Sequence, residues 1–135
     1  MAIDGDQSAD ELAVRLPATS DSARVARHLV RDLLARAGRP QGLVQDAELV
    51  THELVMNGVL HGRPDPAGEI RVCCTVVPGE VCICVHDSGA AGAVEVQPPS
   101  TDSPSGRGLA LVDALCSSWS VERGDGTRVS ARLSA

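Results

Sequence analysis

The sequence contains no lysine, no phenylalanine and no tyrosine, and it has one tryptophan in 135 residues. Because all 12 basic residues are arginines, the chain has neither a Walker loop nor the site of eukaryotic-type kinases, both of which place a lysine on the phosphates. The shortage of aromatic rings removes stacking platforms for nucleobases. The 18 acidic residues give a net charge of -6, whereas nucleic acids bind to basic surfaces. We therefore expect no direct binding to nucleic acid, and any nucleotide site must use groups other than lysine.

Long apolar segments are also missing. No run of about 18 apolar residues occurs, and the first ten residues are acidic and polar. We expect a cytoplasmic protein that does not enter a membrane. Apolar residues make up 43% of the chain, which is enough for a core, and the length is typical of one domain. The predicted organisation is a flexible segment at 1–10 and a single domain at 11–135.

The five cysteines are an odd number in a chain without an export signal, so we expect reduced thiols. On strands, Cys82 and Cys84 would share one face, whereas Cys73 and Cys74 would point to opposite faces. Four of them therefore cannot easily meet at one zinc ion. Together with Cys116, they are predicted to be small buried apolar residues.

The spacing of apolar residues predicts the order of the elements. Alternation over 12–16, ended by a proline, predicts a strand at a sheet edge. Helical spacing predicts helices over about 20–37 and 41–61. The remaining predicted elements are a hairpin of strands at 69–77 and 80–87, a loop of small residues at 88–105, a helix from about 107, and a closing hairpin at 119–122 and 128–133.

The helix predicted over 41–61 carries a carboxylate and a carboxamide one turn apart. Glu53 and Asn57 lie on the same flank of its buried stripe, so both face one site. Taken alone, this spacing has a second interpretation, namely two surface or capping side chains with ordinary hydrogen-bond partners.

Two further segments place polar groups or flexible backbone at the ends of elements. Asp87 and Gly89 directly follow an apolar strand, and the alternative interpretation is an ordinary turn. Gly106, Arg107 and Gly108 lie where a loop becomes a helix. Backbone amides and the helix dipole can hold phosphate oxygens at such a position.

In this order, the three segments resemble the Bergerat, or GHKL, ATP-binding fold, and in particular the small anti-sigma-factor serine/threonine kinases of bacteria. The motifs are E-L-V-x-N-x-V-x-H-G at 53–62, D-x-G at 87–89 and G-R-G-L-x-L-V at 106–112. Trp119, Val121, Gly126 and Thr127 extend the match, which spans about 12–133. The resemblance implies a two-layer α/β (α+β) sandwich, with a mixed, mostly antiparallel sheet covered on one face by about three helices.

The resemblance also implies roles for individual residues. Asn57 would be a ligand of Mg²⁺, a hard cation that prefers oxygen ligands. Asp87 would accept a hydrogen bond from the adenine amine of ATP, Thr127 would assist it, and Gly89 would let the base approach the backbone. Glu53 would orient or deprotonate the attacking hydroxyl of a partner serine. The phosphates would be held beneath a lid at about 90–106 by Gly106, Arg107, Gly108 and Leu109.

Two features depart from the family pattern. The first glycine box usually reads D-x-G-x-G, but Ala91 occupies the second glycine position and Gly92 is displaced by one. The lid is short, rich in proline and poor in charge, so Arg107 is the only cation predicted near the transferred phosphate.

Three functions are consistent with these residues. The first is a kinase that phosphorylates an anti-anti-sigma protein of the STAS type and otherwise holds a sigma factor inactive. The second is a nucleotide-binding module that regulates a partner without phosphotransfer. The third is the detached catalytic domain of a sensor histidine kinase, which we disfavour because no helical hairpin with a phosphoacceptor histidine precedes the domain. The family implies a homodimer, and the arginine-only basic set suggests a GC-rich bacterial genome.

Overall fold

The computed structural model of the chain describes residues 10–89 and 104–134, with the side chains of 104–109 excepted. The first of two hairpins is formed by β2 (Glu69–Val77) and β3 (Glu80–Asp87), and the second by β4 (Ser118–Gly124) and β5 (Gly126–Ser134). The other described elements are β1 (Glu11–Pro17), α2 (Asp21–Arg36), α3 (Gln41–His61) and α4 (Pro104–Leu115).

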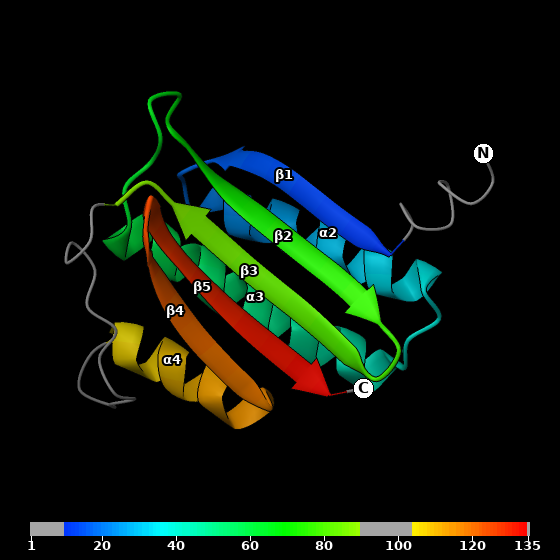
Figure 1. The fold of residues 1–135 in the computed structure, drawn as a ribbon. Helices are drawn as coiled ribbons and strands as arrows, with labels where there is room; N and C mark the ends of the chain where they lie inside the picture. Colours follow the sequence, from blue (N-terminus) through cyan, green and yellow to red (C-terminus); the bar gives the residue numbers. More distant parts are fainter. Residues whose placement is uncertain (1–9, 90–103, 135) are drawn as a thin grey trace.

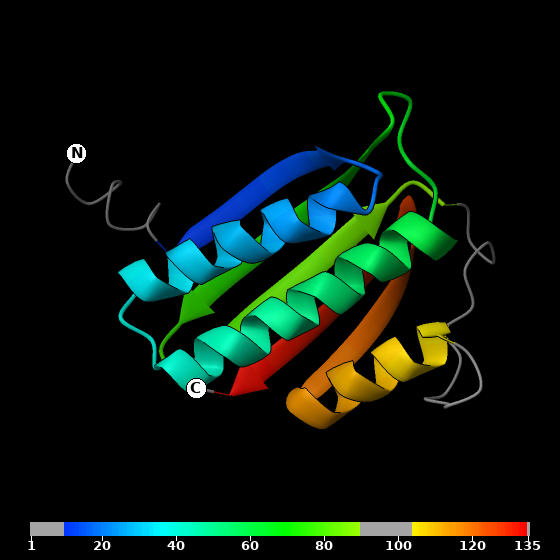
Figure 2. The same ribbon diagram turned by 180° about the vertical axis from the view of Figure 1, so that it is seen from behind.

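The strands form one sheet in the order β1-β2-β3-β5-β4, with β1 at an edge as predicted. All three helices lie on one face of this sheet, and the described residues leave the other face uncovered (Figures 1 and 2). The two-layer α/β class is therefore confirmed. Each described pairing is antiparallel, whereas the prediction was a mixed, mostly antiparallel sheet. Two helices separate β1 from β2, and the chain reverses direction three times on this path, so that β2 runs antiparallel to β1 (Figures 1 and 2).

The core lies between the inner face of the sheet and the helices. Alternating residues of β2 and β3 are buried there, among them Val72 and Ile83, which are both inaccessible to solvent. On α3, Val50 and Leu54 occupy one stripe at helical spacing and fill the same layer. Gly58 continues that stripe, and a Cβ there would lie 3.1 Å from Val85 Cγ1. The small residue thus lets α3 pack closely on β3, the strand that ends at Asp87.

Helix α4 begins at Pro104, earlier than the predicted start near Arg107. Proline suits the first helical position, because its missing N–H would have no partner there and its φ is already helical. Most of the predicted lid at 90–106 lies outside the described residues. Within the described part of the chain, no helix combines the length and the apolar character that are needed to cross a bilayer.

Candidate functional site

The Asp87 carboxylate lies at the end of the central strand β3 and is 6% exposed. Its Oδ1 accepts hydrogen bonds from the backbone N–H groups of Gly89, at 2.6 Å, and of Arg63, at 3.3 Å. Within the described residues no donor is bonded to Oδ2. The backbone therefore fixes the orientation of this buried carboxylate and leaves one acceptor oxygen for another group.

Gly62, directly after α3, provides the space that the carboxylate occupies. A Cβ at Gly62 would clash with the Asp87 carboxylate and would lie 2.7 Å from the Gly58 carbonyl oxygen. The Gly62 N–H donates to that same oxygen at 3.0 Å. The end of α3 touches the end of β3. Gly62, which closes the first motif, is therefore required by Asp87, which opens the second motif.

Thr127 lies directly opposite Asp87 in the register of β3 and β5. It is 1% exposed, and its hydroxyl has no hydrogen-bond partner among the described residues. A buried hydroxyl without a partner carries a desolvation cost of about 1–3 kcal/mol. The preceding Gly126 has a φ of +85°, and a Cβ there would clash with the Asp87 carbonyl oxygen. The two strands therefore bring a carboxylate and an unsatisfied hydroxyl to one place on the inner face.

The flank of α3 that carries Glu53 and Asn57 faces α4. Asp46 shares this flank with both, because the three follow helical spacing (i, i+7, i+11). Burial, then the carboxylates of Asp113 and Asp46, raise the pKa of Cys116, which directly follows α4, to about 11. Asp46 therefore lies near the C-terminal end of α4. Glu53 and Asn57 lie further toward the C-terminus of α3, on the flank that faces α4. Both are half-buried, and neither is hydrogen-bonded to another described residue.

Helix α4 runs antiparallel to α3, so its N-terminus lies at the end of the molecule where α3 and β3 terminate (Figure 2). Gly106, Arg107 and Gly108 belong to the first turns of this helix, together with Leu109. Their side chains lie outside the described set. The backbone places the predicted phosphate-binding segment at the same end of the fold as Asp87 and Thr127. Ala91 and Gly92, which depart from the family pattern, are not among the described residues.

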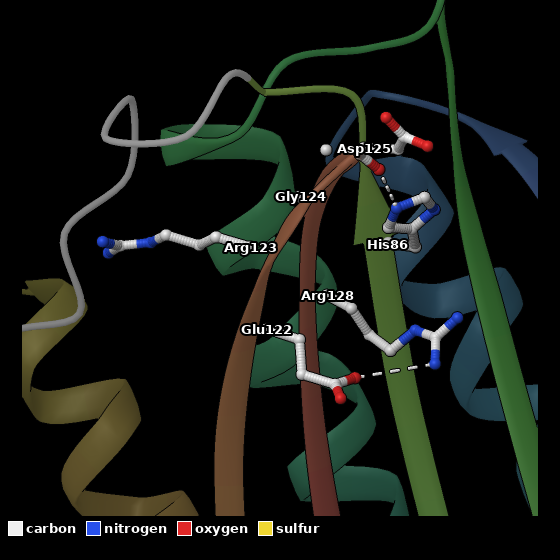
Figure 3. A pocket seen from close by; sticks show the side chains of 7 residues that line it. His86, Glu122, Arg123, Gly124, Asp125 and Arg128 are labelled. Carbon is white, nitrogen blue, oxygen red and sulfur yellow. Dashed lines mark hydrogen bonds and ion pairs between the residues drawn. The ribbon is translucent and has the colours of Figure 1, made fainter.

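Arg123 is a cation that the sequence reasoning missed. It pairs directly with Thr127 in the register of β4 and β5, so the two residues share a face of the sheet. Figure 3 shows its side chain pointing away from His86, Glu122 and Arg128. Alternation along β4 gives the same result, since Trp119 and Val121 also point to the core. Arg107, which the sequence predicted as the only nearby cation, is therefore not the only cation at this end of the fold.

A cavity of about 320 Å³ opens on the other side of this sheet end, lined by residues around the turn between β4 and β5. His86 Nε2 donates to the Asp125 carbonyl oxygen at 2.8 Å, and Arg128 forms an ion pair with Glu122 at 3.6 Å (Figure 3). Asp87 and Thr127 are not part of its lining. This cavity is separate from the buried carboxylate and hydroxyl.

A family model described as the histidine kinase-like ATPase domain matches residues 16–133. The chain belongs to the histidine kinase-like ATPase domain family. Membership of this ATPase family implies that it binds ATP. The chain is 24% identical over 134 residues to the serine-protein kinase RsbW of Staphylococcus epidermidis, covering 90% of this chain and 84% of the relative. The RsbW proteins of two strains of that species match equally well.

The fold also matches a solved structure, which contains the RsbU and RsbW domains of a Mycobacterium tuberculosis protein. The TM-score is 0.70 at 27% sequence identity, and the match covers 91% of this chain. It spans 32% of the other chain, which is a larger protein. The resemblance read from the motifs is thus confirmed as a relationship to RsbW-type histidine kinase-like ATPase domains.

Proposed function

We propose that this ATPase domain is a serine/threonine kinase of the anti-sigma-factor type. It would phosphorylate a STAS-type anti-anti-sigma protein and sequester a sigma factor, and it would act as a homodimer. The observation that carries the proposal is the pairing of buried Asp87 with Thr127, whose hydroxyl has no hydrogen-bond partner among the described residues. The names of the relatives support the serine-kinase chemistry and the RsbW type.

The residues present fit the adenine end of ATP. Adenine carries an exocyclic amine that donates and a ring nitrogen that accepts a hydrogen bond. Asp87 Oδ2 supplies an acceptor and the Thr127 hydroxyl supplies a donor, and both lack a partner among the described residues. Because the carboxylate is already oriented by two backbone N–H groups, it loses little freedom when it accepts the amine.

The phosphate end of ATP would lie at the N-terminus of α4, where backbone amides and the helix dipole favour negative charge. Asn57 would hold Mg²⁺ through its amide oxygen, and the cation would neutralise charge on the phosphates. Glu53, one turn earlier on the same flank, would accept the proton of the partner's serine hydroxyl. Arg123 adds positive charge on the inner face near Thr127.

The role of Glu53 predicts a separation of binding from catalysis. Glu53→Gln removes the base but keeps the size of the side chain, so phosphotransfer is expected to fall by roughly 100-fold or more while ATP affinity is retained. The measurement is transfer of labelled γ-phosphate to STAS-type proteins of the same genome, beside calorimetric titration of Mg·ATP. Glu48→Gln is the matched control, because Glu48 lies on the opposite flank of α3. Undiminished transfer by Glu53→Gln would contradict the proposed base.

The Thr127 hydroxyl, which lacks a partner in the described part of the chain, predicts changes of opposite sign in stability and in ATP binding. Thr127→Val keeps the branched shape and removes the buried hydroxyl, so the free enzyme is expected to gain about 1 kcal/mol of stability. ATP affinity is expected to fall about fivefold, since a neutral hydrogen bond contributes roughly 1 kcal/mol. Denaturant unfolding and calorimetry measure the two effects. A loss of stability would show that the hydroxyl has a partner in the free protein.

A second candidate is a nucleotide-binding module that switches a partner without phosphotransfer. The observation that favours it is Ala91 at the second glycine position of the first glycine box. Such a module would bind Mg·ATP and a sigma factor normally, and Glu53→Gln would change neither. No transfer by the unaltered protein, combined with nucleotide-dependent partner binding, would select this function over the kinase.

A further inference from the structure

Two cysteines lie side by side on the sheet face that the described helices leave uncovered. Cys73 on β2 and Cys84 on β3 are directly opposite in the register, and both are half-buried. Their neighbours in sequence differ from them, because Cys74 points into the core and is inaccessible to solvent. The prediction of five buried cysteines is therefore correct for Cys74 and wrong for the other four, which are all partly exposed.

The register of β2 and β3 places the two Cα atoms at a separation that suits a disulfide. Directly opposed residues of antiparallel strands have Cα atoms about 4.5–5.5 Å apart, and disulfides span Cα separations of about 4.4–6.8 Å. The two residues also face the same side of the sheet, since Cys74 and Ile83 point to the core. A bond between the sulfurs would therefore not require a change of register.

The surroundings make the two thiols unequal. The side-chain interaction with the neighbouring Cys84 thiol lowers the pKa of Cys73 to about 6 against the opposing effect of burial, and the nearby cations Arg71 and Arg128 lower it further. The side-chain interaction with Cys73 and burial raise the pKa of Cys84. At pH 7 Cys73 is thus mainly a thiolate, which is the nucleophilic form, and Cys84 keeps its proton.

We propose that Cys73 and Cys84 form a peroxide-reactive pair that closes to a cross-strand disulfide. The Cys73 thiolate attacks one oxygen of a hydroperoxide, the O–O bond breaks, and the other oxygen leaves as an alcohol or water after taking up a proton. Cys73 is then a sulfenic acid. The Cys84 sulfur attacks the Cys73 sulfur, and the hydroxyl of the sulfenic acid leaves as water with the Cys84 proton. Two thiols are oxidised by two electrons, and one peroxide is reduced.

Mass spectrometry of the full chain tests the bond directly. The protein is treated with hydrogen peroxide at pH 7, blocked with iodoacetamide and cleaved after glutamate, which separates Cys73 from Cys84 at Glu80. We expect one cross-linked pair of peptides whose fragments place the bond between these two sulfurs. No cross-link, or one through Cys74, would overturn the proposal.

Two serine variants test the partner. Cys84→Ser is expected to abolish the cross-link and to leave a sulfenic acid at Cys73 that dimedone traps. Cys82→Ser is the matched control, because Cys82 lies on the same strand and face but is opposite Thr75. It is expected to form the cross-link at the rate of the unaltered protein. Equal loss of the cross-link in both variants would overturn the assignment of Cys84.

The unaltered protein offers a second test that needs no variant. Alkylation of Cys73 by iodoacetamide is expected to reach half of its maximal rate near pH 6, because only the thiolate reacts. Half-maximal alkylation above pH 8 would overturn the proposal. The titratable and charged groups on this face of the neighbouring strands are Glu11 and Arg15 on β1, Glu69 and Arg71 on β2, Glu80, Cys82, Cys84 and His86 on β3, and Arg128 and Arg132 on β5.

Discussion

Replacing Asp87 with asparagine is expected to weaken ATP binding by roughly 100-fold, with little change in stability. A hydrogen bond to a charged group contributes about 1.5–3 kcal/mol, and each 1.4 kcal/mol is a factor of ten in affinity. The amide oxygen of Asp87→Asn can still accept from the N–H groups of Gly89 and Arg63. Its NH₂ group then occupies the position of Oδ2 and presents a donor to the adenine amine, which is also a donor. Calorimetric titration of Mg·ATP measures the loss.

Asp65 provides a matched control for this substitution. Its Oδ1 accepts hydrogen bonds from the N–H groups of Ala67 and Glu69, both at 2.9 Å, so it has the same kind of backbone contacts. Asp65 lies in the loop before β2, where its carboxylate forms an ion pair with Arg15. Asp65→Asn removes the same charge and is expected to leave ATP affinity unchanged. Equal weakening by both variants would mean that net charge, and not the carboxylate at Asp87, determines binding.

Gly126→Ala is expected to destabilise the protein by about 3 kcal/mol and to lower its melting temperature by roughly 10 °C. A side chain at a φ of +85° is strained by about 1–2 kcal/mol. In addition, the new methyl group would clash with the Asp87 carbonyl oxygen and lie 3.0 Å from His86 Nε2. Overpacking of this kind costs about 1–3 kcal/mol. Because the clash falls on the backbone of Asp87, ATP binding is expected to weaken as well.

Gly79→Ala separates the two contributions. Gly79, in the turn between β2 and β3, has a φ of +83°, and nothing lies within 4 Å of a Cβ built there. Its alanine variant carries the backbone strain without the clash, so we expect a loss of about 1 kcal/mol and normal ATP affinity. Calorimetric melting of both variants gives the difference. If the two alanine variants had the same melting temperature, the close approach of Gly126 to Asp87 would contribute nothing to stability.

The sequence predicted the elements well because its periodicities are clear. The alternation in β2 and β3, and the Pro78-Gly79 turn between them, gave the hairpin with its observed bounds. The D-x-G motif placed Asp87 at the end of an apolar strand, where the structure has it, although an ordinary turn fits the same residues. The start of α4 was misplaced, since Pro104 reads as a loop residue unless it is recognised as the first residue of a helix.

The features that were missed depend on contacts between distant segments. No local pattern shows that Gly62 leaves space for Asp87, or that the hydroxyl of Thr127 is buried without a partner among residues 10–89 and 110–134. The opposition of Cys73 and Cys84 follows from the register of the hairpin. It could have been found by counting outward from the turn. Arg123 could have been found in the same way, by extending the alternation of Trp119 and Val121.

The position of α4 in the fold has a consequence for how the molecule exchanges its ligand. Asp87 is held in a central strand with neighbours on both sides, whereas α4 packs against α3 and the edge strand β4. Local unfolding of an edge element costs less free energy than opening the centre of a sheet. ATP and ADP share the base and differ at the phosphates, which the proposed site places beside this weakly held helix. Under the proposed function, ATP and ADP would therefore differ in how they stabilise α4, whereas both would contact the central strands in the same way.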